Sequence, residues 1–232
     1  MAPHDMFDFL AEYRRVAPEL DYSYIPVDCN DMIHGRRNPL GDKLYDDLGI
    51  TLCAAVPVAH CQRSYAVVVD GTSFGRVAYS GDCRPSNRFA DVAYGADLLI
   101  HEATFEDGME EDAVMKRHST VGEAIGVAGK MNAGALVLTH FSQRYPKIPP
   151  LNERRCAKDE EGKGKKRIPI AFAFDFMRLA PHTIELAAKL TPALRLLYPG
   201  EEELEMESTS NNAVTAKELM AVPGVFAAKG VL

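Results

Sequence analysis

The middle of the chain alternates between short apolar runs and segments with helical spacing. Strand-length apolar runs occur at 56–58, 66–69, 76–79, 96–100, 135–138 and 168–174. Asp70-Gly71 predicts a turn between the second and third runs. Helical stretches are expected around 89–93 and from Thr120 to about Met131, where Thr120-Val-Gly-Glu123 is a capping-box sequence. This alternation predicts a layered α/β domain.

The two ends of the chain differ from this regular middle. We expect residues 1–49 to form a helix (5–16, with Phe7, Phe9, Leu10 and Val16 on one side) and then an irregular lead-in with a turn at Gly41-Asp42. Residues 50–182 carry the α/β domain, and its charged run at 152–167 is expected to be an inserted surface loop. Residues 183–232 are predicted to be a C-terminal helix followed by an acidic, flexible tail.

Composition narrows the class of protein further. The formal net charge is −7, so the chain does not bind nucleic acid through bulk positive charge. No apolar run reaches the roughly 18 residues of a membrane span, so no membrane partner is expected. The five cysteines form no C-x-x-C pair, and the N-terminus lacks the features of a secretory signal. These features favour a globular protein with free thiols in a reducing compartment.

Several polar residues follow the apolar runs at similar places. His60, Asp82, His101-Glu102 and His140 each come at or just after the end of one run. In layered α/β folds this edge of the sheet gathers ligands and catalytic groups, and imidazole with carboxylate suits Zn²⁺ or Mn²⁺. Taken singly, each histidine is more often structural, and Asp82 could be a helix cap. Together they predict a metal site without naming a reaction.

Four segments identify a family. Ser80-Gly81-Asp82, His101-Glu102-Ala103-Thr104, His118-Ser119-Thr120 and the segment THFSQRY at 139–145 occur in this order, with His60 upstream. Together they closely resemble tRNase Z (ribonuclease Z), long eukaryotic form, over about residues 5–207. The resemblance implies a fold class: α/β, the C-terminal half of a metallo-β-lactamase-like αββα sandwich. It implies an endoribonuclease that removes the 3′ trailer of precursor tRNA by two-zinc phosphodiester hydrolysis.

The resemblance also implies a role for each residue. His60 looks like a ligand of one zinc, His140 a ligand of the other, and Asp82 the carboxylate that bridges both ions. Glu102 and His118 resemble the pair that passes a proton to the leaving oxygen, a role that suits an imidazole oriented by a carboxylate. The family implies precursor tRNA as partner and the nucleus, the mitochondrion or both as location. The residues that contact tRNA are unknown.

One family motif is absent from the sequence. The principal metal motif of the family, H-x-H-x-D-H, has no counterpart here, because the chain contains no H-x-H. Each zinc would then keep two of its four protein ligands, so weak or absent zinc binding is expected. We therefore expect the chain to be a fragment that is inactive alone and needs the upstream half of the same enzyme. A partial gene prediction, a split gene and an internal start would each explain it.

Two other functions compete with this one. The chain could be a non-catalytic, degenerate half that packs on a partner chain, although its reactive groups at 82, 102, 118 and 140 argue against long decay. It could also be another hydrolase of the superfamily, but the HST and HFSQRY segments argue against that.

Overall fold

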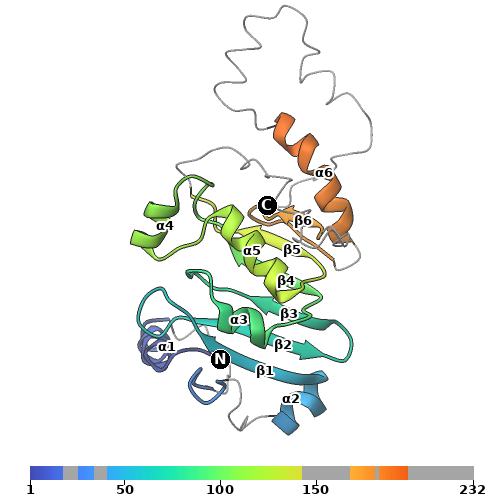
Figure 1. The fold of residues 1–232 in the computed structure, drawn as a ribbon. Coiled ribbons are helices and arrows are strands. Elements are labelled where there is room, and N and C mark those ends of the chain that lie inside the picture. Colours follow the sequence, from blue (N-terminus) through green and yellow to red (C-terminus); the bar gives the residue numbers. More distant parts are fainter. Residues whose placement is uncertain (18–25, 34–40, 143–167, 181–182, 198–232) are drawn as a thin grey trace, which may run out of the picture.

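A computed structural model describes residues 1–17, 26–33, 41–142, 168–180 and 183–197 (Figure 1). Its centre is one six-stranded sheet in which the strands follow chain order. The first three strands pair antiparallel, and the third to sixth pair parallel. The strands are β1 (Ile50–Pro57), β2 (Tyr65–Gly71), β3 (Gly75–Tyr79), β4 (Leu98–Glu102), β5 (Leu136–Thr139) and β6 (Ile170–Phe172).

Helices pack on both faces of this sheet. They are α1 (His4–Val16), α2 (Gly41–Leu48), α3 (Asn87–Val92), α4 (Glu110–Lys116), α5 (Val121–Met131) and α6 (Ile184–Leu197). The main core forms where α3 and α5 cover the sheet, and Phe89, Leu99, Met131 and Leu136 are fully buried in it. None of the helices in the described ranges has the length and apolar character needed to cross a membrane.

Local sequence explains where α5 begins and ends. The Thr120 side chain accepts a hydrogen bond from the Glu123 backbone N–H, and the Glu123 carboxylate accepts one from the Thr120 N–H. Asn132 ends the helix in the left-handed conformation, with φ 53°. At Gly134 a Cβ atom would lie 2.8 Å from the Asp97 carbonyl oxygen, so glycine is needed where the chain enters β5. The predicted helix is confirmed at both ends.

The α/β prediction is confirmed, but parts of the lead-in and loops differ from expectation. Gly41-Asp42 begins α2 rather than a turn, and α4 was not expected. Helix α4 has one buried residue, Ala113, so it carries no apolar stripe that a periodicity could reveal. On α1, Phe7 and Leu10 are half-buried whereas Phe9 and Val16 are exposed, so the expected single apolar side is wrong. The 152–167 insertion and the tail beyond 197 lie outside the described residues.

The second face of the sheet is also apolar. Val69, Val77 and Leu98 are direct neighbours across β2, β3 and β4, and Val67, Tyr79 and Ile100 form the adjacent row. All but Tyr79 are half-buried, and Tyr79 is exposed. We call these six residues the apolar sheet face.

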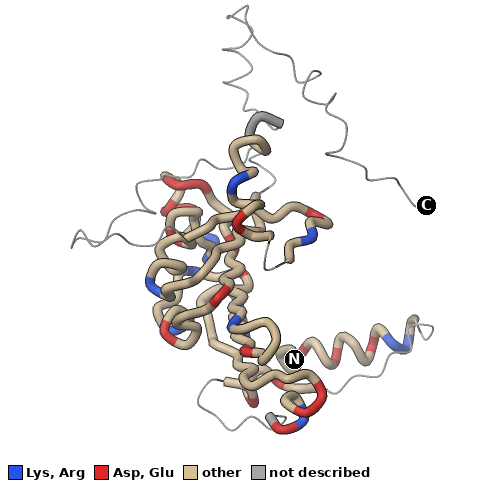
Figure 2. The backbone as a smooth tube through the Cα atoms, turned by 90° about the vertical axis from the view of Figure 1, so that its right-hand side faces the viewer, with Lys and Arg blue, Asp and Glu red and all other residues tan. Residues whose placement is uncertain are grey.

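Among the described residues, a small cluster packs beside this face at the β1 edge of the sheet. Cys29, Met32 and the partly buried Leu44 of α2 pack against Ala55 of β1. Figure 2 shows α1 running away from the body of the sheet instead of across it. None of the six residues of the apolar sheet face is fully buried, so the face is only partly covered.

Candidate active site

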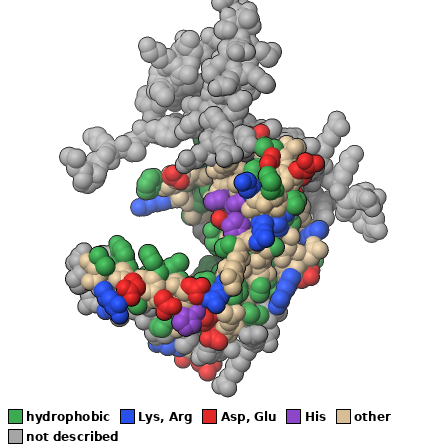
Figure 3. Space-filling model, turned by 90° about the vertical axis from the view of Figure 1, so that its left-hand side faces the viewer, with side chains coloured by type: hydrophobic (Ala, Val, Ile, Leu, Met, Phe, Trp, Pro, Cys, Tyr) green, Lys and Arg blue, Asp and Glu red, His purple; other side chains and the backbone are tan. Residues whose placement is uncertain are grey.

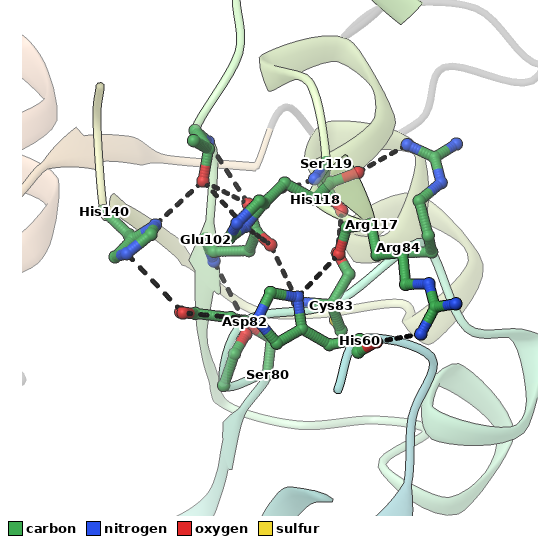
Figure 4. A network of polar contacts seen from close by, with 12 residues as sticks. His60, Ser80, Asp82, Cys83, Arg84, Glu102, Arg117, His118, Ser119 and His140 are labelled. Carbon is green, nitrogen blue, oxygen red and sulfur yellow. Dashed lines mark hydrogen bonds and ion pairs between the residues drawn. The ribbon is translucent and has the colours of Figure 1, made fainter. Parts of the chain in front are cut away.

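The five predicted site residues meet at one edge of the sheet (Figure 4). Strands β1, β3, β4 and β5 run in the same direction, so their carboxyl ends lie together. His60 and Asp82 each lie three residues beyond a strand end, Glu102 is the last residue of β4, and His140 directly follows β5. His118 follows α4 after the left-handed residue Arg117. In the space-filling view, histidine side chains lie at the wall of a hollow that α1 borders on its other side (Figure 3).

Asp82 lies between two imidazoles. Its Oδ2 is 4.0 Å from His60 Nε2 and 3.6 Å from His140 Nε2. Two ligands of one tetrahedral zinc, each about 2.05 Å from the ion, lie roughly 3.4 Å apart. The two distances are close to this value, so one carboxylate oxygen could serve two neighbouring ions, one with each histidine.

Hydrogen bonds fix which nitrogen each imidazole presents. A backbone carbonyl only accepts, so His60 Nδ1–H donates to the Arg117 oxygen at 3.0 Å. The Thr104 hydroxyl donates to Glu102 Oε2, and therefore accepts from His140 Nδ1–H at 2.8 Å. In the neutral form of each imidazole, Nε2 is therefore the nitrogen without a proton, and it lies on the side of Asp82. This is the arrangement of histidine ligands in metal sites, so the donor set fits zinc.

Glu102 is the polar centre of the site and is only 1% exposed. Its carboxylate accepts five hydrogen bonds, of 2.7 to 3.2 Å. The donors are the backbone N–H groups of Cys83, Thr104 and Ser119, the Thr104 hydroxyl and His118 Nδ1. Three separate segments of the chain therefore depend on one carboxylate for their position.

His118 lies at the centre of the histidine cluster. Its Nδ1 is 2.8 Å from Glu102 Oε1, and its ring centroid is 4.6 Å from that of His60 and 5.3 Å from that of His140. Geometry alone places His118 in two groups of potential metal donors, one with His60 and Asp82 and one with Glu102 and His140. Because Nδ1 is held by Glu102, Nε2 is the nitrogen left for chemistry.

Burial changes the protonation of two neighbouring side chains. Burial, and then the negative charges of Glu102 and Asp82, raise the pKa of the Cys83 thiol to about 12. Burial lowers the pKa of His101, although a hydrogen bond to the Glu102 carbonyl opposes the shift. Both groups are therefore neutral near pH 7.

Sequence reasoning missed two residues that orient the site. Thr104 links Glu102 to His140, and Arg117 both accepts from His60 Nδ1–H and donates from its guanidinium to the His60 carbonyl at 2.7 Å. Thr104 lies in the recognised HEAT segment, so its hydroxyl beside a strand-end carboxylate was a usable signal. Arg117 acts largely through backbone atoms, which no side-chain pattern reveals.

The chain was compared with known proteins. No model of a protein family matches it. It is 37% identical over 213 residues to ribonuclease Z 1 of Schizosaccharomyces pombe, covering 89% of this chain and 25% of that protein. It is 34% identical over 210 residues to the human zinc phosphodiesterase ELAC protein 2, covering 88% of this chain and 24% of that protein. The crystal structure of a long-form RNase Z from yeast superposes with a TM-score of 0.67 at 31% identity, over 84% of this chain and 29% of that one.

The mixed sheet with histidines and a carboxylate at its carboxyl edge places the chain in the metallo-β-lactamase fold class. Within that class, the chain belongs to the ribonuclease Z family. It spans about a quarter of the length of the curated relatives that it matches.

Proposed function

We propose that this chain supplies the C-terminal half of the active site of a tRNA 3′-processing endoribonuclease. The observation that carries the proposal is the Asp82 carboxylate held between His60 Nε2 and His140 Nε2, with the Glu102–His118 pair beside it. The reaction would cut precursor tRNA on the 3′ side of the discriminator nucleotide and leave a 3′-hydroxyl. By family resemblance, such an enzyme serves the nucleus, the mitochondrion or both.

His60, Asp82 and His140 would hold part of a two-zinc site. When bound, the two ions supply an activated water and stabilise the attacking and leaving oxygens. The protein's task is to aim both histidine Nε2 atoms at Asp82, and the Arg117 carbonyl and the Thr104 hydroxyl do this by binding the Nδ1–H groups. The remaining ligands would come from the H-x-H-x-D-H motif of the upstream half.

Glu102 and His118 would handle the proton. Because Nδ1–H is held by the buried carboxylate, protonated His118 can give up only the Nε2 proton. The 3′ oxygen of the discriminator nucleotide is the leaving group, and this proton would neutralise it as the P–O bond breaks. The ring lies between His60 and His140, which would put the acid next to the reacting phosphate.

The partner in this proposal is the upstream half of the same enzyme, and the apolar sheet face supports it. Its sheet would cover the apolar sheet face, as expected when two sheets pack into a sandwich. The same assembly would complete the zinc ligands. A half that only packs on a partner chain, without catalysis, would need the apolar sheet face but neither Asp82 between two histidines nor the hydrogen-bonded Glu102–His118 pair.

The test is cleavage of a 3′-extended precursor tRNA during a zinc titration, by this chain alone and with the upstream half added. We expect cleavage only in the mixture, lost in Asp82→Ala and retained in Asp91→Ala, a control on the exposed side of α3. Cleavage by the chain alone would contradict the shared-ligand proposal. A folded mixture without activity would favour the non-catalytic packing function.

A further inference from the structure

We propose that Arg84 is a positioning residue that sets the orientation of His118. The inference rests on the proposed function only for its effect on cleavage. Arg84 lies two residues after Asp82, its side chain is about one-fifth exposed, and the resemblance assigns it no role. Figure 4 shows its guanidinium on the side of His118 away from Glu102.

The guanidinium holds two groups at once. Nη1 donates to the His118 carbonyl oxygen at 2.5 Å and to Glu123 Oε2 at 2.8 Å, while Nη2 donates to Glu123 Oε1. This is the paired geometry in which an arginine fork binds a carboxylate, and lysine cannot reproduce it. Glu123 is itself fixed by the capping box of α5. Arg84 therefore ties the His118 backbone to the first turn of a buried helix.

One peptide group explains why this matters for His118. The carbonyl of His118 and the N–H of Ser119 belong to the same planar unit. Arg84 binds its oxygen, and Glu102 Oε2 accepts its N–H at 3.1 Å. The peptide is thus held from both edges, which fixes the backbone from which the His118 ring projects toward Glu102 Oε1. Loss of the Arg84 side chain would remove this hydrogen bond to the His118 carbonyl and leave only the Ser119 N–H of the peptide bound.

The backbone around Arg84 links it to the rest of the site. The Arg84 N–H donates to the Ala59 carbonyl at 3.0 Å, directly before His60. The neighbouring Cys83 carbonyl accepts from the Ser119 hydroxyl at 2.6 Å. These backbone contacts do not depend on the Arg84 side chain, so a substitution should disturb His118 more than His60.

The test compares Arg84→Met, which removes every donor, with Arg84→Lys, Glu123→Gln and the control Arg88→Met on the exposed side of α3. The first readout is the imidazole ¹⁵N NMR spectrum of the full chain without metal. We expect His118 to be in the Nδ1–H form in the wild type, to mix forms in Arg84→Met, and to shift less in Arg84→Lys. His60 should change little, and Arg88→Met should match the wild type.

The second readout is cleavage of precursor tRNA by the mixture with the upstream half. Arg84→Met should lower kcat by about 10- to 100-fold, as a small misplacement of a catalytic group does, and leave KM within about twofold. An unchanged His118 spectrum in folded Arg84→Met overturns the proposal. If Arg84→Met fails to fold, Arg84→Lys and Glu123→Gln decide by the same spectrum. If the wild-type mixture does not cleave, the proposed function fails while the spectrum still decides the role of Arg84.

Discussion

Single residues in this site act mostly by fixing protons. Glu102 accepts the Nδ1 proton of His118, and the Arg117 carbonyl accepts that of His60. The Thr104 hydroxyl donates to Glu102 and therefore accepts the Nδ1 proton of His140. Each imidazole therefore presents the same nitrogen to the centre of the site. A substitution that removes the Thr104 hydroxyl should therefore change the orientation of the His140 ring, although Thr104 itself has no proposed contact with the substrate.

Cysteine reactivity tests the burial around Asp82. In the folded chain we expect iodoacetamide at pH 8 to modify the exposed Cys61 and to spare Cys83, since only the thiolate reacts and Cys83 has a pKa of about 12. Peptide mass spectrometry after labelling measures both sites. Both should react in denaturant, and equal labelling in the folded chain would contradict the buried position of Cys83.

His101 should make stability depend on pH. Its folded pKa lies below the ordinary 6.5, so the unfolded chain takes up the proton first as pH falls. The stability that comes from keeping His101 neutral is therefore fully present above pH 6.5 and is lost as the pH falls below it. Denaturant unfolding between pH 7.5 and 5.5 should show a smaller loss for His101→Phe than for the wild type. His4→Ala, on exposed α1, should follow the wild type, and parallel curves for His101→Phe would refute the assignment.

Among the elements, α5 has the clearest sequence signals for its start, its buried side and its end. Its cap, its buried side and its left-handed end all agree, and sequence alone located it. The hairpin of β2 and β3 was equally accessible, because both strands have apolar residues beside a turn sequence. Helices α2 and α4 were missed because short helices with few buried residues carry no periodicity, and tertiary contacts decide whether they form.

The cap of α5 can be tested by itself. Thr120→Val keeps the shape of the side chain but removes the hydroxyl that accepts from the Glu123 N–H. We expect the free energy of unfolding to fall by about 1 kcal/mol, the usual cost of losing an N-cap. Urea denaturation followed by circular dichroism measures it. Thr72→Val, at an exposed turn, should change it much less, and equal losses would argue against the cap.

At the scale of the whole molecule, the apolar sheet face is an incompletely buried apolar surface of the described residues. Val77 lies in its middle, with Val69 and Leu98 as direct neighbours. Large exposed apolar patches in soluble proteins mark sites of association. Stability and solubility of this chain should therefore depend on what covers that face.

Val77→Thr tests this surface while keeping the branched shape. We expect the variant to bind less of the dye 8-anilinonaphthalene-1-sulfonate and to assemble less tightly with the upstream half, because a hydroxyl enters the apolar contact. Dye fluorescence and gel filtration measure the two effects. Val114→Thr, on exposed α4, is the control. Unchanged dye binding and assembly in Val77→Thr would show that another surface makes the contact.

Sequence predicted the α/β class and placed His60, Asp82, Glu102 and His140 at strand ends, because apolar runs and the residues that follow them are local features. It did not predict the contacts that orient them. Arg117 and Arg84 reach backbone carbonyls more than 30 residues away, at His60 and His118, and such contacts exist only after the sheet has formed. The resemblance supplied roles for side chains, whereas the structure supplied the partners of each ring nitrogen.

The order of the strands has a consequence for synthesis on the ribosome. Each strand of the sheet pairs with the strand that precedes it in the chain, from β1 to β6. Among the six described strands, none has to enter between two that are already paired, so this sheet can grow at one edge as the nascent chain emerges. Even the long interval between β5 and β6 adds little cost, because the entropy of closing a loop rises only slowly with its length. The order in which the ribosome releases the strands is therefore the order in which they lie in the sheet.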